Sequence, residues 1–159
     1  MRMSEGVEWA LHSCLNLAWA GPDRPVTAAR LAAYHELPAP YLNKQLQALV
    51  RAGIVVSASG PRGGFRLARP LARITLMDVV AAVEGPDEVF RCTEIRQQGP
   101  GGGAPASYRP PCAFAHAMAR AELAWRRELA GQTLDDVREQ AEAQAPAAPE
   151  RLRRWLANG

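Results

Sequence analysis

The residues best suited to chemistry in this chain are its three cysteines, Cys14, Cys92 and Cys112. Three is a small and odd number for 159 residues, so the cysteines do not indicate a disulfide framework. A thiolate is a strong ligand for soft metals and a centre of redox reactions. The cysteine content therefore leaves metal binding and thiol redox chemistry as the functions to consider.

Glu8 and His12 are a second candidate pair, because residues four positions apart project from one face of a helix, about 40° apart around its axis. A carboxylate and an imidazole can both bind a metal. Cys14 would lie about 200° from His12 around that helix, so we expect it in the core. On the residues alone, Glu8 and His12 could equally be an ordinary surface pair, with Cys92 a buried thiol and Cys112 a small residue at a helix start.

The elements that position these residues are expected to be mainly helical. Val7, Leu11, Leu15 and Ala18 recur at helical spacing and predict an amphipathic helix over residues 7–20. Residues 27–52 then predict two short helices, the first capped by Thr27, with a proline-marked turn between them. Together they form a helix-turn-helix pattern.

The second of these helices, over residues 40–52, has a polar face beside its apolar stripe. Asn and Gln can pair with adenine edges, and Lys reaches guanine or phosphate, so this face suits a DNA major groove. A merely solvated surface is the alternative. Residues 39–73 also contain six basic residues and no Asp or Glu, which favours an anionic partner.

A β-hairpin is predicted directly after the helix-turn-helix. Residues 54–59 and 65–69 are two short runs typical of strands, joined by a Gly-rich tip that carries Arg62. An ordinary hairpin with solvated arginines is possible, but its position predicts the wing of a winged helix-turn-helix that binds double-stranded DNA. The residues expected to contact DNA are Pro40, Tyr41, Asn43, Lys44, Gln45, Arg62, Gly63 and Gly64.

The second half of the chain contains a long helical pattern. Thr75 is predicted to cap a helix that ends at Gly85, and a Gly-Pro-rich loop follows up to residue 111. The helix predicted over residues 112–132 has more apolar surface than one packing stripe needs, which favours a dimer interface over an internal core helix. Its apolar residues are Phe114, Met118, Ala121, Leu123, Trp125 and Leu129.

Several protein classes are disfavoured. The chain has no GxSxG elbow, phosphate loop or HExxH helix, so we do not expect an enzyme. His35 and His116 have no carboxylate or cysteine at helical spacing and are not expected to be ligands. No apolar run is long enough to cross a bilayer, and the N-terminus lacks the apolar segment of a secretory signal. We expect a cytoplasmic protein, and its net charge of +3 permits DNA binding without requiring it.

Four segments together resemble a known family of winged-helix transcription regulators that includes IscR and NsrR. They are SEGVEWALHSCLNLA, PYLNKQLQAL, GPRGGFRLAR and ITLMDVVAAVEG, and the similarity spans about residues 1–140. Members are homodimers, and several hold an iron–sulfur cluster that controls DNA binding. The resemblance is greatest to the redox-sensing 2Fe–2S regulator RsrR, and it implies a mainly α fold with a small β-hairpin and a long dimerisation helix.

The resemblance also implies a set of cluster ligands. Members with a cluster commonly carry three closely spaced cysteines, whereas here only Cys92 and Cys112 stand in that region. The pattern similar to RsrR adds Glu8 and His12, donated by the partner subunit. Trp9, next to Glu8 in sequence, is a candidate redox reporter, with an ordinary core or interface aromatic as the alternative. The same four donors also suit zinc, so a clusterless or zinc-stapled module that binds DNA or a protein is the alternative.

The implied organisation has four parts. Residues 1–85 would form the winged helix-turn-helix and residues 86–111 the cluster-binding loop. Residues 112–141 would form the dimerisation helices and residues 142–159 a C-terminal tail. The expected protein is a homodimeric DNA-binding regulator whose affinity for DNA follows the redox state of its 2Fe–2S cluster.

Overall fold

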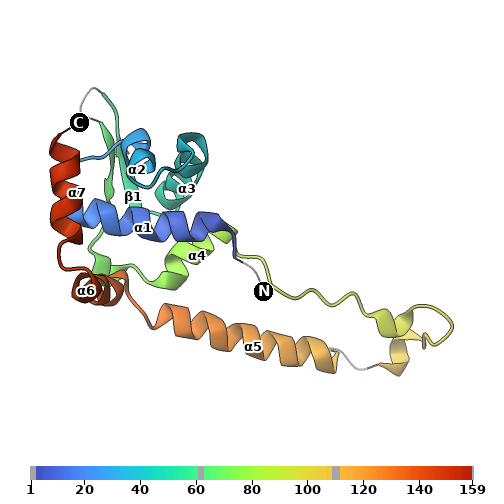
Figure 1. Cartoon of the computed structure of the whole chain (residues 1–159). Coiled ribbons are helices and arrows are strands. Elements are labelled where there is room, and N and C mark those ends of the chain that lie inside the picture. The colour runs from blue at the N-terminus through green and yellow to red at the C-terminus, as the bar shows by residue number, and fades with distance from the viewer. Residues whose placement is uncertain (1–2, 61–62, 109–111, 159) are drawn as a thin grey trace.

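The computed structural model describes residues 3–60, 63–108 and 112–158. The α-helices are α1 (Glu5–Ala20), α2 (Ala28–Tyr34), α3 (Ala39–Arg51), α4 (Leu76–Glu84), α5 (Ala113–Ala130), α6 (Leu134–Gln144) and α7 (Ala148–Ala157), and the strands are β1 (Val55–Ala58) and β2 (Gly64–Leu67). This mainly helical architecture with one hairpin confirms the fold class expected from the sequence (Figure 1).

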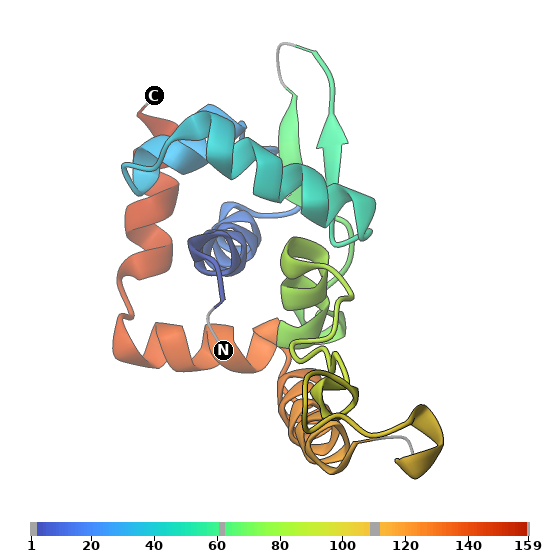
Figure 2. The same cartoon turned by 90° about the vertical axis from the view of Figure 1, so that its right-hand side faces the viewer.

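Helix α1 lies at the centre of the fold and packs against α3, α4, α6 and α7, which surround it in Figure 2. Its buried face differs from the predicted one. Val7 is buried as expected, but Ala10 and Cys14 are the fully buried residues, whereas Leu11 and Leu15 are only half-buried. The small side chains let neighbouring helices approach closely, so α1 places its smaller residues in the core and leaves two leucines on a second apolar face.

The helix-turn-helix forms as its sequence predicts. The Thr27 hydroxyl accepts a hydrogen bond from the backbone N–H of Arg30 and caps α2, which ends at Tyr34, before the proline-marked turn. The leucines of α3 enter the core, with Leu42, Leu46 and Leu49 completely buried. Their burial determines which face of α3 remains exposed and available to another molecule.

The hairpin pairs β1 with β2 in antiparallel register, from Val55 opposite Leu67 to Ala58 opposite Gly64. Val26 adds a third, bridging segment, because its backbone exchanges hydrogen bonds with Phe65. A Cβ on Gly64 would lie 2.7 Å from the carbonyl carbon of Val26. Gly64, which was expected to contact DNA, therefore lies close against the protein's own backbone, where a side chain would not fit.

Two helices that begin with capping boxes start side by side. Thr75 caps α4 together with Asp78, and Thr133 caps α6 together with Asp136, both with the reciprocal hydrogen bonds of the motif. The two threonines form a β-bridge, so α6 starts beside the start of α4. Helix α6 thereby packs against the winged helix-turn-helix of its own chain, and its expected part in dimerisation stays a prediction.

Residues 142–159 were expected to form a tail, and within them α7 packs against α1. Its Leu152 and Leu156 are buried, and the Trp155 ring packs edge-on against Tyr34 with ring centroids 5.3 Å apart.

We call residues 3–60, 63–85 and 133–158 the head. Among the described residues, no helix combines the length and apolar character needed to cross a bilayer.

The remaining described residues, 86–108 and 112–132, form an arm that extends from the head (Figure 1). The loop after α4 lies along α5, and two hydrogen bonds hold it there. The Glu122 carboxylate accepts from the backbone N–H of Val89, and Arg126 donates to the carbonyl of Asp87. Trp125 lies beside α4 of its own chain, where it lines a hollow with Met77 and Val80. By contrast, Phe114 is 78% exposed.

Candidate metal centre and DNA-binding surface

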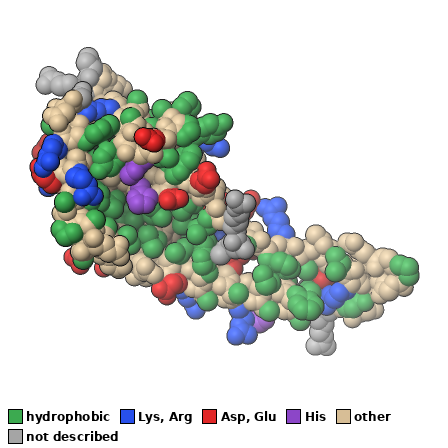
Figure 3. Space-filling view, viewed as in Figure 1, with side chains coloured by type: hydrophobic (Ala, Val, Ile, Leu, Met, Phe, Trp, Pro, Cys, Tyr) green, Lys and Arg blue, Asp and Glu red, His purple; other side chains and the backbone are tan. Residues whose placement is uncertain are grey.

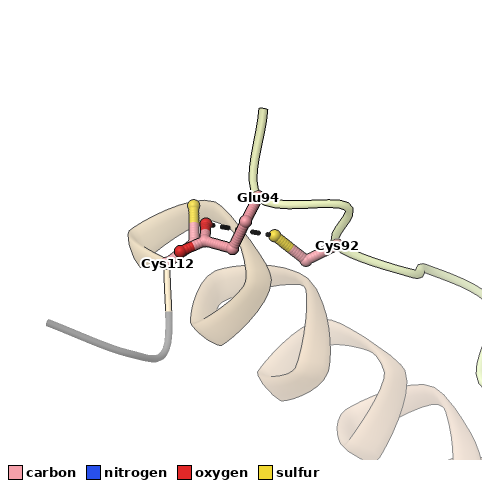
Figure 4. A group of neighbouring side chains, drawn as sticks. All are labelled: Cys92, Glu94 and Cys112. Carbon is pink, nitrogen blue, oxygen red and sulfur yellow. Dashed lines mark hydrogen bonds between the residues drawn. The ribbon is translucent and has the colours of Figure 1, made fainter. Parts of the chain in front are cut away.

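Cys92 and Cys112 meet at the outer end of the arm. Their sulfur atoms and one carboxylate oxygen of Glu94 all lie within 4.8 Å of one another (Figure 4). The Cys92 thiol donates to the Glu94 carboxylate across 3.6 Å. Cys92 is exposed and Cys112 is buried, so the interpretation of Cys92 as a buried structural thiol is wrong. Two cysteines 20 positions apart thus form one group of donors.

The surroundings of Cys112 favour its thiolate. This residue is the N-cap of α5, where backbone N–H groups have no partner within the helix. Hydrogen bonds from the N–H groups of Ala115 and Phe114 lower the pKa of the Cys112 thiol, and the Arg96 guanidinium lowers it further. Because metals bind the deprotonated thiol, these groups prepare Cys112 for ligation.

Glu94 is a member of this group that the sequence did not suggest. Its backbone has φ of 50°, in the left-handed region that residues other than glycine rarely adopt. Arg96 bonds both of its carboxylate oxygens, and this pairing lowers the pKa of Glu94. The carboxylate already has a cationic partner, so the donors that remain for a soft metal are the two thiols. Two adjacent thiols fit half of the ligand set of a 2Fe–2S cluster or of a zinc site.

Glu8 and His12 lie in the head, on α1, far from the cysteines of the same chain (Figure 1). Both are exposed, and both line an apolar hollow of about 450 Å³ between α1 and α6. Leu11, Leu15 and Val137 line it as well. Figure 3 shows this face as an area of hydrophobic side chains below the histidines. Within one chain, the four residues of the implied ligand set therefore form two separate pairs.

His35 lies beside His12, a contact that the sequence did not indicate. Its ring centroid lies 5.8 Å from that of His12, and its Nε2 lies 2.8 Å from the side-chain nitrogen of Asn16, which is buried. Partial burial, and then the charge of His12, lower the pKa of His35. The contact joins α1 to the end of α2, so no spacing within one helix could have indicated it.

Cys14 is a core residue, as expected from its angle to His12. It is fully buried, and burial raises the pKa of its thiol to about 12. Such a thiol is protonated and unreactive at neutral pH.

Four of the eight residues expected to contact DNA lie on the exposed side of α3. Pro40, Asn43 and Lys44 are exposed, and Tyr41 is 65% exposed. Gln45 differs, because its side chain rests on Gly6 of α1, where an added Cβ would lie 2.7 Å from the Gln45 amide nitrogen. Gly63 and Gly64 are half-buried in the hairpin, and Arg62 lies outside the described residues.

Trp9 connects α1 with this surface. It is half-buried and lines a shallow hollow together with Tyr41, Lys44 and Gln45 of α3. The residue next to Glu8 in sequence thus lies beside the polar face of α3. Helix α1 therefore has the Glu8 and His12 pair on one side and the polar face of α3 on another.

Known proteins match the chain over much of its length. The family model Rrf2, described as iron-dependent transcriptional regulator, matches residues 3–140. The HTH-type regulator BadM of Rhodopseudomonas palustris is 40% identical over 84 residues, 53% of each chain, and YffB of Lactococcus lactis is 29% identical over 142 residues, 89% of this chain and 90% of its own. Like BadM, YwgB of Bacillus subtilis is matched over little more than half of its length, 58%.

Solved structures share the fold. CymR of B. subtilis has a TM-score of 0.67 at 24% identity and covers 88% of this chain and 98% of its own. IscR of T. potens has the same TM-score at 21% identity, with 91% of each chain covered. The named relatives are regulators, which agrees with the expectation that the chain is not an enzyme. The winged helix-turn-helix, its hairpin and the family match over residues 3–140 together establish that the chain belongs to the Rrf2 family of transcriptional regulators.

Proposed function

We propose that the chain is a cytoplasmic, homodimeric, DNA-binding transcription regulator whose affinity for DNA follows the redox state of a 2Fe–2S cluster. Cys92 and Cys112 of one subunit and Glu8 and His12 of the other would hold the cluster. The observation that carries this proposal is the separation of the two pairs, one at the end of the arm and one on the head. A second copy is the simplest source of the missing donors.

The surfaces around the two pairs support such an arrangement. The Glu8 and His12 pair borders an apolar hollow, and the cysteine pair borders another, of about 480 Å³, lined by Phe90, Ile95 and Phe114. The exposed side chains of Phe114 and Met118 lie on the arm next to the cysteines. If the arm of one subunit lay along the head of the other, both hollows would be covered and these side chains would leave water.

The donor set suits a cluster that changes its oxidation state while it stays bound to the protein. Such a cluster supplies one-electron chemistry, and replacing two thiolates by an imidazole and a carboxylate favours a higher reduction potential, as histidine does in Rieske centres. The chain's own part is to favour the thiolate of Cys112 through the α5 N–H groups and Arg96, which lower the pKa of this thiol. His12 would contribute its ring from a position beside His35.

Helix α1 offers a route from this site to DNA. Gly6 lies against Gln45, and Trp9 lies beside Tyr41 and Lys44, so a displacement of the first turns of α1 would alter the support of α3. A ligand that binds two states of the helix differently shifts their populations. We therefore propose Trp9 as the residue that repacks between the two states.

Mixed dimers test the shared site. One chain carries Cys92→Ala and Cys112→Ala, the other carries Glu8→Ala and His12→Ala, and differently tagged copies are purified together and reconstituted with iron and sulfide. Each parent homodimer lacks half of the ligands at both sites, whereas a mixed dimer contains one complete site and should recover visible absorption. Verified mixed dimers that stay colourless would disprove sharing across subunits.

The alternative is a zinc-stapled or clusterless regulator, because the same donors can hold a tetrahedral zinc ion. The observation in its favour is that the two thiols lie side by side within one chain. Anaerobically purified wild type separates these functions. A 2Fe–2S protein is brown and contains iron and acid-labile sulfide, whereas the zinc form is colourless and contains zinc.

A further inference from the structure

The loop between the two cysteines is folded upon itself, although its composition indicated an irregular segment. The N–H of Gln97 bonds the carbonyl of Glu94 at 3.0 Å, and the N–H of Gly103 bonds the carbonyl of Arg96 at 3.2 Å. These bonds bring residues 102–103 back over residues 94–97. The loop therefore has a defined internal structure around Arg96 in its described residues, 93–108.

Arg96 is the centre of this structure. Its Nε donates to Glu94 across 3.1 Å, and its Nη2 donates to the other carboxylate oxygen. Its guanidinium carbon lies 4.7 Å from the centre of the Tyr108 ring, over the face of the ring. Glu94 is two residues after Cys92, and Tyr108 is four residues before Cys112. One guanidinium thus joins a neighbour of each cysteine.

Close packing shows that this arrangement is specific. A Cβ on Gly103 would lie 3.0 Å from the Tyr108 ring, and a Cβ on Gly102 would lie 2.8 Å from the backbone carbonyl of Gln97. Both positions favour glycine for this reason. The left-handed backbone of Glu94 is unfavourable for a residue with a side chain, and the two bonds from Arg96 hold it there.

We propose that Arg96 is a positioning residue that holds the Cys92 and Cys112 thiols side by side before any metal or partner binds. Closing a loop of this length costs conformational entropy, and contacts made within the folded chain reduce the part of that cost that ligand binding must overcome. The role of the two thiols as ligands rests on the proposed function. The fixed separation of the two thiols does not rest on the proposed function, and it can be measured in the metal-free protein.

The measurement is the effective concentration of Cys92 and Cys112 toward each other. Metal-free protein is equilibrated with oxidised and reduced glutathione, so that two protein thiols and one glutathione disulfide give one protein disulfide and two glutathione thiols. Cys14 is fully buried and does not compete. Arg96→Met should lower the effective concentration about fivefold to tenfold, because it removes an ion pair and a cation–π contact together.

Arg91→Met is the matched control. Arg91 adjoins Cys92 and carries the same charge, but it is exposed and pairs with Asp87. This variant should change the effective concentration less than about twofold, since exposed ion pairs contribute little. Equal losses in the two variants, or no loss in Arg96→Met, would overturn the proposal. Far-ultraviolet circular dichroism and thermal melting check that both variants are folded.

Conservative variants separate geometry from charge. Tyr108→Phe keeps the ring face under Arg96 and should retain the wild-type value, whereas Tyr108→Leu should show a loss like that of Arg96→Met. Arg96→Lys keeps the charge but cannot bond both carboxylate oxygens in the same way. Its effective concentration should therefore lie between those of Arg96→Met and the wild type. Full recovery with lysine would mean that charge alone acts, against the proposal. A colourless reconstituted wild type with a high effective concentration would refute the cluster and leave the role of Arg96 standing.

Discussion

The side-chain amide of Asn16 lies 2.8 Å from Nε2 of His35, and this pair links the C-terminal half of α1 to the turn between α2 and α3. An amide nitrogen only donates, so Nε2 accepts and the neutral ring carries its proton on Nδ1. Asn16 is 2% exposed, which makes the bond costly to lose.

We expect His35→Leu to lower the free energy of unfolding by about 1–3 kcal/mol, because it leaves the buried Asn16 amide unpaired. Adding Asn16→Leu to that variant should cost less than the sum of the single changes. Urea unfolding at fixed protein concentration measures all three, with His116→Leu as a control at an exposed position on α5. Strictly additive losses would show that the bond contributes nothing.

Stability should fall in acid through Glu142. Trp19 Nε1 donates to this carboxylate at 2.9 Å, and this bond, followed by those of Arg138, holds the pKa of Glu142 below its ordinary value. The unfolded chain therefore takes up the proton first. The stabilisation is complete above the ordinary glutamate pKa and is lost as pH falls through the lowered folded pKa.

Glu142→Gln keeps an oxygen for the Trp19 bond but removes the titrating group, so its unfolding free energy should depend less on pH between about 5 and 3. Urea unfolding at several pH values tests this. Glu139→Gln is the control, because Glu139 is 71% exposed on the same helix. A wild-type pH dependence in Glu142→Gln would contradict the role of the carboxylate.

Substitutions in the proposed DNA surface should weaken binding through different contacts. Lys44→Ala should lower the salt dependence of binding by about one unit of slope, as expected for one lost phosphate contact. Arg62→Ala should cost roughly 1–3 kcal/mol if the side chain contacts a base edge. Titrations at several salt concentrations measure both, with Arg127→Ala on α5 as a charge-matched control. Unchanged affinity of the Lys44→Ala, Arg62→Ala double variant would rule out this placement.

The arm should carry the dimer interface. Phe114 and Met118 lie four residues apart on α5, and both are exposed within one chain. Met118→Glu would place a carboxylate in an apolar interface and should shift the protein toward monomer. Arg120→Glu adds the same group on the opposite side of the helix and should not. Light scattering at micromolar concentration measures the oligomeric state of all three proteins, and a monomeric wild type would refute the interface.

Local signals in the sequence determined the elements. The caps Thr27, Thr75 and Thr133 bond groups only three residues away, so the starts of α2, α4 and α6 could be predicted from short segments. The apolar spacing of α3 likewise fixed which side of that helix is buried. Winged helix-turn-helix architecture followed from these signals together with the hairpin that comes next.

Tertiary packing decided which residues meet. Periodicity assigned Leu11 and Leu15 of α1 to the core, but a central helix has neighbours on several sides, and its small residues, Ala10 and Cys14, allowed the closest packing. The contact of His35 with His12 joins two helices, and the contact of the Arg96 guanidinium with the Tyr108 ring joins two ends of one loop. Sequence patterns record interactions within a few residues, whereas these contacts depend on how distant segments pack, so only the folded chain determines them.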